Sequence, residues 1–246
     1  MSRNPLKLGV NIDHVATLRQ QRHTPYPSVL EAGRVCEEAG AHGITVHLRE
    51  DRRHIQDADV NELKRHLTIP LNLEMANSPE IVKIALDLHP DEVCLVPERR
   101  QELTTEGGLD VAGSRNSLER TVKALSEAGI VVSLFVDPDP AQIEASAKIG
   151  APYVELHTGT FCDAAGLKKK GELSRLLKGA RAAHDSGLKV NAGHGINLHN
   201  IRDILGLPYL DTLNIGHSIV CRAVFVGLAE AVREMQKAMR AYRGGK

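Results

Sequence analysis

The stretch HDSGLKVNAGHG (residues 184–195) joins a polar, helix-like segment to a short apolar run through a single glycine. The same arrangement recurs in EEAGAHGITVHL (37–48), SEAGIVVSLFV (126–136) and KIGAPYVELH (148–157). Glycine suits the left-handed position just after a helix, and a Val- and Ile-rich run after it is typical of a buried parallel strand. The repeat therefore predicts an alternation of helices and parallel strands.

Eight apolar runs are predicted to be strands, and a helical segment follows each of them. Eight such units in 246 residues match the size and order of a TIM (β/α)8 barrel, for which a doubly wound sheet is the main alternative. No linker or change of composition divides the chain, so we expect residues 1–246 to form a single (β/α)8-barrel domain of the α/β class. The predicted strands are 7–13, 43–49, 70–75, 92–97, 131–137, 153–158, 189–193 and 212–216.

Two of the predicted helices illustrate the periodicity. Ser28 and Glu31 form a capping-box pattern at the start of the first apolar stripe. The last helix is predicted from a stripe that begins at Val224 and continues through Leu228, Val232, Met235 and Met239.

Composition argues against several classes of protein. The 31 basic residues balance the 31 acidic ones, so no net field draws the chain to nucleic acid or to an anionic membrane. The four cysteines are scattered, which argues against a disulfide framework and a thiolate zinc site. No signal-peptide or membrane-spanning run is present in the sequence, and no nucleotide-binding motif suggests a cofactor. We expect a cytoplasmic protein without nucleic-acid or membrane partners.

Alternate residues of the predicted strands differ in character, because one phase is polar and the other is apolar. In a barrel strand, alternate residues face the interior and the surrounding helices. The apolar phase can pack only against helices, so the polar phase is expected to face inward, where each polar group needs a partner or a ligand. The polar phase comprises Asn11, Asp13, Thr45, His47, Arg49, Asn72, Glu74, Glu155, His157, Asn191 and Asn214.

Five histidines lie at or next to the predicted carboxyl ends of strands, where TIM barrels place their active sites. A single such histidine is more often structural, but five at one end favour a functional role. With Glu74 and Glu155 they offer groups suited to proton transfer at neutral pH. No lysine occupies the carboxyl end of a predicted strand, which argues against a Schiff-base aldolase. The five are His14, His47, His157, His194 and His217.

Two anion sites and one long loop are also predicted. The turns GHG (193–195) and GHS (216–218) follow the last two strands, where TIM barrels often bind phosphate through backbone N–H groups. A second anion site is expected around Arg49 in HLREDRRHI (47–55), since guanidinium groups match phosphate oxygens. The polar segment 97–117 is longer than most loops of this kind, so we expect a lid there.

Long segments of the chain, in order, resemble the pyridoxine 5'-phosphate synthase family. They are GVNIDHVATLRQQR (9–22), GITVHLREDRRHI (43–55), NLEMA (72–76), LVPERRQELTTEGGLDV (95–111), SLFVD (133–137), VELHTG (154–159), KVNAGHG (189–195) and LNIGHSI (213–219). The resemblance implies a TIM barrel with extra helices and a homo-oligomer, an octamer of dimers. It also implies condensation of 3-amino-2-oxopropyl phosphate with 1-deoxy-D-xylulose 5-phosphate to pyridoxine 5'-phosphate, phosphate and water, with neither a metal nor an organic cofactor.

The resemblance also implies roles for individual residues. His47 and Glu74 match the family's proton acceptors, His194 its proton donor and Glu155 its transition-state stabiliser. The site for the aminoketone phosphate is expected at Asn11, Arg22, Gly195, Gly216 and His217. The site for the deoxyxylulose phosphate is expected at Asp13, His14, Arg49, His54 and Thr104.

Two other functions fit the polar interior. A metal-dependent hydrolase or aldolase would use His14, His47, His157, His194 and Glu74 as zinc ligands. A sugar-phosphate binding protein would use the same interior only for recognition.

Overall fold

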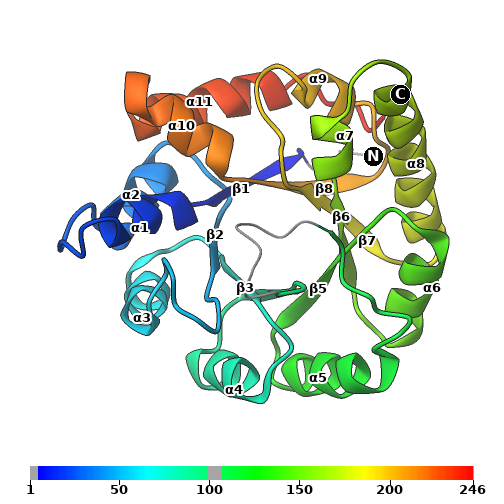
Figure 1. Cartoon of the computed structure of the whole chain (residues 1–246), viewed down its shortest axis with the longest axis horizontal. Helices are drawn as coiled ribbons and strands as arrows, with labels where there is room; N and C mark the ends of the chain where they lie inside the picture. Colours follow the sequence, from blue (N-terminus) through cyan, green and yellow to red (C-terminus); the bar gives the residue numbers. More distant parts are fainter. Residues whose placement is uncertain (1–4, 99–106, 246) are drawn as a thin grey trace.

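The computed structural model of the chain describes residues 5–98 and 107–245. Within these residues, eight parallel strands close into a barrel in sequence order, and β1 pairs with β8 to complete it. The fold is the predicted TIM barrel, and the doubly wound alternative is wrong, because a doubly wound sheet is open. Figure 1 looks into the barrel and shows the helices arranged around it. The strands are β1 (Lys7–Asn11), β2 (Gly43–His47), β3 (Leu71–Met75), β4 (Glu92–Leu95), β5 (Val131–Val136), β6 (Tyr153–His157), β7 (Lys189–Gly193) and β8 (Leu210–Ile215).

Several strands end one or two residues earlier than predicted, for local reasons. The side chain of Asn11 accepts a hydrogen bond from the backbone N–H of Asp13 at 2.9 Å, which turns the chain out of β1 and into a helix. At the end of β4, Pro97 has no N–H to continue the ladder. Asp13 and Arg49 therefore lie just beyond their strands, on the segments that follow.

Helices connect the strands and cover the barrel, and several are additional to the basic repeat. Ser28 Oγ accepts a hydrogen bond from the backbone N–H of Glu31 at 3.2 Å, as the capping pattern predicts. The helices are α1 (Asp13–Gln20), α2 (Val29–Glu38), α3 (Asp57–His66), α4 (Pro79–Leu88), α5 (Arg115–Glu127), α6 (Pro140–Lys148), α7 (Gly159–Asp163), α8 (Gly166–Asp185), α9 (Ile201–Ile204), α10 (His217–Val226) and α11 (Leu228–Met239).

The predicted last helix is two helices. Gly227 adopts a φ of 84° between α10 and α11, a conformation that favours glycine and separates the two axes. The stripe from Leu228 to Met239 packs inward as predicted, with Val232 fully buried. Val224, which the pattern assigned to the same stripe, instead lies on α10 with 72% of its surface exposed.

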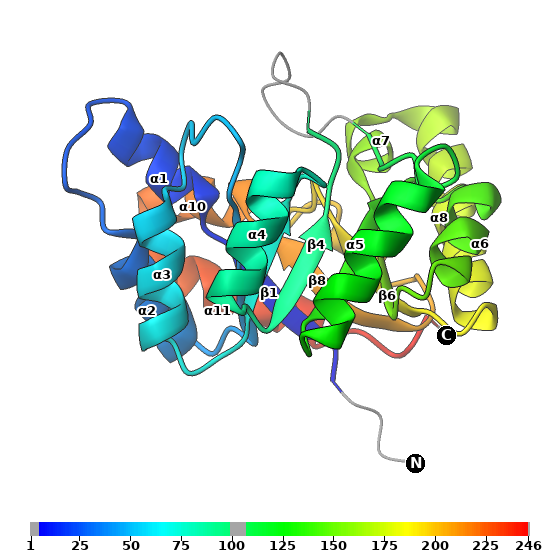
Figure 2. The ribbon, with the colours of Figure 1, turned by 90° about the horizontal axis from the view of Figure 1, so that it is seen from below.

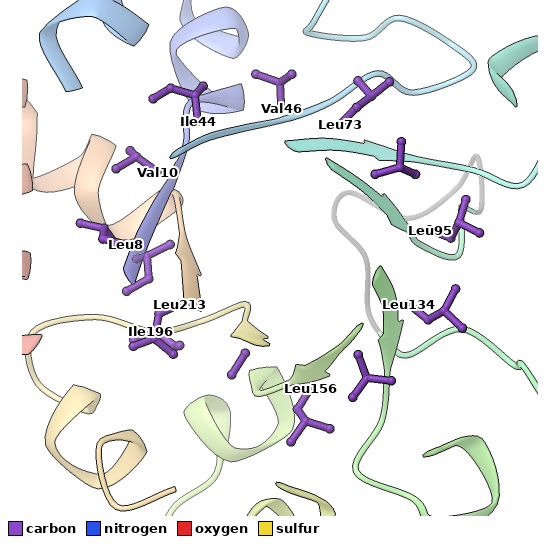
Figure 3. Packing of buried hydrophobic residues seen from close by; sticks show 14 of the residues in the cluster. Leu8, Val10, Ile44, Val46, Leu73, Leu95, Leu134, Leu156, Ile196 and Leu213 are labelled. Atoms are coloured by element: carbon purple, nitrogen blue, oxygen red, sulfur yellow. The ribbon is translucent and has the colours of Figure 1, made fainter. Parts of the chain in front are cut away.

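The main hydrophobic core lies between the barrel and the helices. Figure 3 shows side chains such as Leu8, Val46 and Leu156 pointing outward from their strands. These side chains have no exposed surface, which confirms the predicted apolar phase. A second, small cluster of Cys94, Val96 and Phe135 lies apart from this core.

The strands all run the same way, so the loops after them gather at one end of the barrel. In Figure 2 these carboxyl ends lie toward the top, and the chain enters β1 from below. Predicted site residues that end a strand, such as Asn11 of β1 and His47 of β2, therefore lie at this upper end. None of the helices in the described part of the chain is long and apolar enough to cross a membrane.

Candidate active site

A chain of hydrogen bonds crosses the interior of the barrel. Asn72 donates to Thr45 Oγ1 at 3.2 Å, and Thr45 donates to Asn214 Oδ1 at 3.2 Å. Asn214 Nδ2 then donates to Glu155 Oε2 at 2.5 Å. All four side chains are buried, so strands β3, β2, β8 and β6 contribute the polar phase to the interior as predicted.

Two glycines leave the space that this network occupies. A Cβ atom on Gly9 would lie 2.1 Å from Asn214 Oδ1, and one on Gly193 would lie 2.1 Å from Glu155 Oε1. Any side chain at either position would displace the amide or the carboxylate. The interior is therefore shaped around these polar groups, which are fixed in place before any ligand arrives.

Two further carboxylates, those of Asp13 and Glu74, lie close together beside this network. Asn11 Nδ2 donates to Asp13 Oδ2 at 2.9 Å and reaches Glu74 Oε2 at 3.5 Å, while Asp13 Oδ1 accepts from the backbone N–H of His47 at 2.8 Å. Burial, with the charges of Asp13 and Glu155, raises the pKa of Glu74 well above its ordinary value. Burial also raises the pKa of Glu155 to about 7. Glu155 can therefore exchange a proton near neutral pH, and Glu74 holds its proton more tightly than an exposed carboxylate.

His47 and Arg49 share a buried carboxylate that the sequence analysis missed. Glu98 Oε2 lies 3.5 Å from His47 Nε2, and Glu98 Oε1 lies 3.6 Å from Arg49 Nε. Burial alone would raise the pKa of Glu98, but His47 and Arg49 lower it below its ordinary value. Glu98 Oε1 also accepts a hydrogen bond from the backbone N–H of Glu50 at 3.0 Å. Glu98 therefore ties the segment after β4 to the end of β2.

His194 occupies the turn after β7 in an unusual backbone conformation. Its φ is 78°, and Thr158 Oγ1 lies 2.5 Å from its carbonyl oxygen and 2.7 Å from that of Gly193. Its ring lies beside the ring of His157, with centroids 5.2 Å apart. Burial, followed by the charge of His157, lowers the pKa of His194 to about 4. His194 is therefore a neutral imidazole at neutral pH when the site is empty.

The remaining predicted histidines also lie near other histidines. The rings of His14 and His217 meet edge to face at 4.8 Å, and those of His47 and His54 lie 6.2 Å apart. Burial lowers the pKa of His14, with a further contribution from His217, and burial also lowers the pKa of His54. The structure brings these rings together in pairs. The pair of His14 and His217 joins residues that were predicted for the two different substrate sites.

The two Gly-His turns lie side by side. Ser218 Oγ donates to the carbonyl oxygen of Ile196 at 2.6 Å and so joins the turn after β8 to the turn after β7. A Cβ atom on Gly216 would lie 2.8 Å from both Cβ and the carbonyl oxygen of Asn11. Gly216 precedes α10, whose ten residues begin at His217 with backbone N–H groups that lack a partner within the helix. The start of α10 therefore presents backbone N–H groups of the kind that bind anions.

Two predicted residues are not brought to this cluster. Arg22 is exposed in the segment between α1 and α2, which extends away from the barrel in Figure 1. Thr104, with the rest of residues 99–106 of the predicted lid, lies outside the described residues. Their roles in substrate binding stay predictions.

Asp137 and Glu98 could have been found by extending the alternation. No polar phase was predicted in β4 and β5, where the inward residues Cys94, Val96 and Phe135 form the small apolar cluster. Counting on by two from Val96 gives Glu98, and from Phe135 it gives Asp137. Asp137 Oδ1 lies 3.0 Å from His157 Nδ1. The missing signal was the same period-two pattern, continued past the strand ends.

Within residues 5–98 and 107–245, no three His, Cys, Asp or Glu side chains are placed to hold a metal ion.

Solved structures support the fold. The chain superposes on 3-hexulose-6-phosphate synthase with a TM-score of 0.67 at 16% identity, covering 95% of this chain and 99% of that one. It superposes on thiamine phosphate pyrophosphorylase from Pyrococcus furiosus with a TM-score of 0.64 at 18% identity, covering 97% and 98%. At such low identity the likeness concerns the fold alone.

Sequence relatives are much closer. The chain is 53% identical over 232 residues to pyridoxine 5'-phosphate synthase of Coxiella burnetii, covering 94% of this chain and 97% of that protein. It is 55% identical over 237 residues to the protein of the same name from Photobacterium profundum, covering 96% and 98%. A family model described as pyridoxal phosphate biosynthesis protein PdxJ matches residues 8–241. The chain therefore belongs to the PdxJ family of pyridoxal phosphate biosynthesis proteins.

Proposed function

We propose that this chain is a pyridoxine 5'-phosphate synthase that condenses 3-amino-2-oxopropyl phosphate with 1-deoxy-D-xylulose 5-phosphate and releases phosphate and water. The observation that carries the proposal is the identity of 52–55% with enzymes of that name over nearly the whole chain. The buried groups at the carboxyl end of the barrel suit this reaction, because each of its steps moves a proton.

The carboxylates and His47 act as the bases of the reaction. Imine formation between the amine and the pentulose ketone, loss of water and ring closure all require protons to leave carbon or nitrogen. Glu74 and His47 accept these protons, and the raised pKa of Glu74 makes its carboxylate a stronger base than an exposed one. Glu155, hydrogen-bonded to Asn214 and fixed in the interior, stabilises positive charge that develops on the nitrogen.

His194 acts as the acid of the reaction. The leaving hydroxyl and phosphate groups need a proton, and the turn after β7 places the His194 ring next to Gly195 and the start of α10. A neutral imidazole at this position gives up the proton of its N–H group. It must then regain a proton before the next turnover.

The two phosphates bind at adjoining sites, whose residues meet where the rings of His14 and His217 lie 4.8 Å apart. Gly195, Gly216 and His217 hold the aminoketone phosphate with backbone N–H groups at the start of α10, and Asn11 and Arg22 complete that site. Arg49 and His54, together with Asp13, His14 and Thr104, bind the deoxyxylulose phosphate. The guanidinium of Arg49 is buried beside Glu98, which fixes its direction.

The enzyme works without a metal or an organic cofactor, as a cytoplasmic homo-oligomer. Its four cysteines are free thiols, which suits a reducing compartment. An octamer of dimers would cover exposed apolar side chains on neighbouring helices, Leu18 of α1 and Val224 and Phe225 of α10. Light scattering at several protein concentrations tests the octamer.

One incubation tests the function. Purified protein with both phosphates is expected to form pyridoxine 5'-phosphate and inorganic phosphate in equal amounts, and each substrate alone is expected to form none. Turnover that is lost on chelation and restored by zinc would favour the metal-dependent alternative. Saturable binding of both phosphates without any product would favour the sugar-phosphate binding protein.

A further inference from the structure

Behind His194 lies a second imidazole that the proposed mechanism does not use. His157 ends β6, has 4% of its surface exposed and lies between two groups of different character. On one side its Nδ1 lies 3.0 Å from Asp137 Oδ1. On the other side its ring meets the ring of His194 edge to face. The three groups form a row from β5 through β6 to β7.

The geometry fixes the orientation of His157. Phe135 packs against its ring with centroids 5.2 Å apart, and the Asp137 contact uses Nδ1, so Nε2 is directed toward His194. A Cβ atom on Gly159 would lie 2.5 Å from His157 Nε2 and 2.7 Å from His194 Cδ2. The absence of a side chain at Gly159 thus keeps clear the space where the two rings meet.

Asp137 is suited to hold positive charge on His157. The hydrogen bond with His157 lowers the pKa of Asp137, although burial opposes this, so Asp137 is ionised at neutral pH. An ionised carboxylate favours the charged form of an imidazole that it contacts. The side chain of Asp137 is 43% exposed, which connects this end of the row to bulk water.

We propose that His157, held by Asp137, is a positioning residue for His194 that returns a proton to it after each donation. The inference rests on the proposed function, because it concerns the acid of that reaction. In the step, the N–H bond at His157 Nε2 breaks and an N–H bond on His194 forms, directly or through one water molecule. Asp137 stays ionised throughout, and His157 recovers its proton from bulk water.

The low proton affinity of His194 explains why such a partner is useful. Burial and its histidine neighbours lower the pKa of His194 to about 4, so little of the ring carries an extra proton at neutral pH. A neighbouring imidazole that contacts a partly exposed carboxylate can resupply the proton without requiring His194 itself to stay charged in the buried site.

The test uses Asp137→Asn with Asp139→Asn as its matched control. Asparagine at 137 keeps the shape and an acceptor oxygen but removes the charge. Asp139 lies two residues further on, accepts a hydrogen bond from the backbone N–H of Ala141 and caps α6, a role that asparagine also fills. We expect Asp137→Asn to lower kcat roughly 100-fold, with the KM for each phosphate changed less than about 3-fold. Asp139→Asn should behave like the wild type.

The pH profile separates proton supply from a purely structural role. The charged groups that bear on this row are Asp137 after β5, His194 after β7, Asp163 on α7, Arg175 on α8 and His217 on α10. Of these, Asp137 is the one in hydrogen-bond contact with His157. Asp137→Asn removes the negative charge that faces this row, so the alkaline limb of kcat should move to lower pH. Asp137→Glu should restore part of the rate and of the limb.

A second variant keeps the inference open to contradiction if Asp137→Asn folds poorly. His157→Gln retains an amide near the Nε2 position but cannot carry a proton, so its kcat should fall by a similar factor. Wild-type protein that forms no product overturns the proposed function and this inference with it. Wild-type turnover in both Asp137→Asn and His157→Gln, or a rate loss without any shift of the alkaline limb, overturns the inference alone.

Discussion

The two ends of the barrel differ in which ionisable side chains lie next to one another. At the amino end, opposite charges meet: Lys7 Nζ lies 3.2 Å from Asp211 Oδ2, and Lys7 and Lys189 both lower the pKa that burial raises at Glu92. At the carboxyl end, ion pairs such as that of Arg49 with Glu98 lie beside contacts between like groups. Glu74 faces Asp13 and Glu155, and the imidazoles of His14, His47, His157 and His194 each lie beside another imidazole.

This difference separates a structural end from a reactive one. Opposite charges neutralise one another and leave no need for a ligand. Carboxylates that face carboxylates, and imidazoles that face imidazoles, shift one another's pKa values and keep protons easy to move.

The largest expected effect is at the acid of the reactive end. His194→Asn should lower kcat by about three orders of magnitude, because the asparagine amide cannot deliver a proton. Asparagine is chosen since it tolerates the positive φ at this position better than alanine. Steady-state formation of pyridoxine 5'-phosphate measures the loss, and a melting temperature close to the wild type shows that the fold is kept. A variant with more than a tenth of the wild-type kcat would contradict the assignment of His194.

The next effect concerns stability and its dependence on pH. The folded-state pKa of Glu155 is about 7, above the ordinary value of 4.5, so the folded protein binds a proton between these values and loses stability as pH rises through them. Glu155→Gln removes the charge while its amide oxygen still accepts from Asn214. The variant should match the wild type at pH 4 and be more stable by roughly 2–3 kcal/mol above pH 7.

Thermal unfolding from pH 4 to pH 8.5 measures this difference. Because one pKa unit corresponds to about 1.4 kcal/mol, the gap should open mainly between pH 4.5 and 7. A constant gap at all pH values would mean that packing, rather than ionisation, distinguishes the two proteins. The variant should lose turnover even though it gains stability.

A smaller effect is expected where backbone meets ligand. Gly216→Ala places a Cβ atom 2.8 Å from the carbonyl oxygen of Asn11, so the turn before α10 must shift. Its N–H groups then no longer point toward the phosphate. The KM for the aminoketone phosphate should rise roughly 10- to 100-fold, about 1.4–2.8 kcal/mol, while the KM for the deoxyxylulose phosphate stays within about 3-fold. Gly171→Ala is the control, because nothing lies within 4 Å of its added Cβ. Equal changes for both substrates would contradict the division of the two phosphate sites.

The smallest effect is expected at the amino end. Lys7→Met removes the ion pair with Asp211, whose partners are both partly exposed, and should change the free energy of unfolding by less than about 1 kcal/mol. Turnover should stay within about 2-fold of the wild type. A large loss of turnover would show that the two ends of the barrel are coupled and would break the distinction between them.

Much of the fold could be predicted from the sequence because it depends on local patterns. The glycine after each helix and the apolar run behind it locate the βα units, and eight of them leave few arrangements. The alternation of polar and apolar residues also predicted which side chains face inward, as Thr45, Asn72 and Asn214 do. The division of the last helix at Gly227 was missed, since the apolar period continues across the glycine and only the backbone turn interrupts it.

The candidate site was predicted in part for the same reason. Residues on strands, such as Glu74 and Glu155, have positions fixed by the period of two. Glu98 and Asp137 follow their strands, where the period weakens, and their roles depend on contacts with β2 and β6 that no local pattern encodes.

The sequence by itself determined the barrel, the polar interior and the family to which the chain belongs, because these follow from periodicity and from long matching segments. Only the tertiary structure decided which groups share a proton. Glu74 acquires its raised pKa from burial and from Asp13 and Glu155, which are 61 and 81 positions away in the chain, and His157 acquires its partners from β5 and β7. Proton affinity depends on distance and burial in space, and those are properties of the closed barrel rather than of any segment within it.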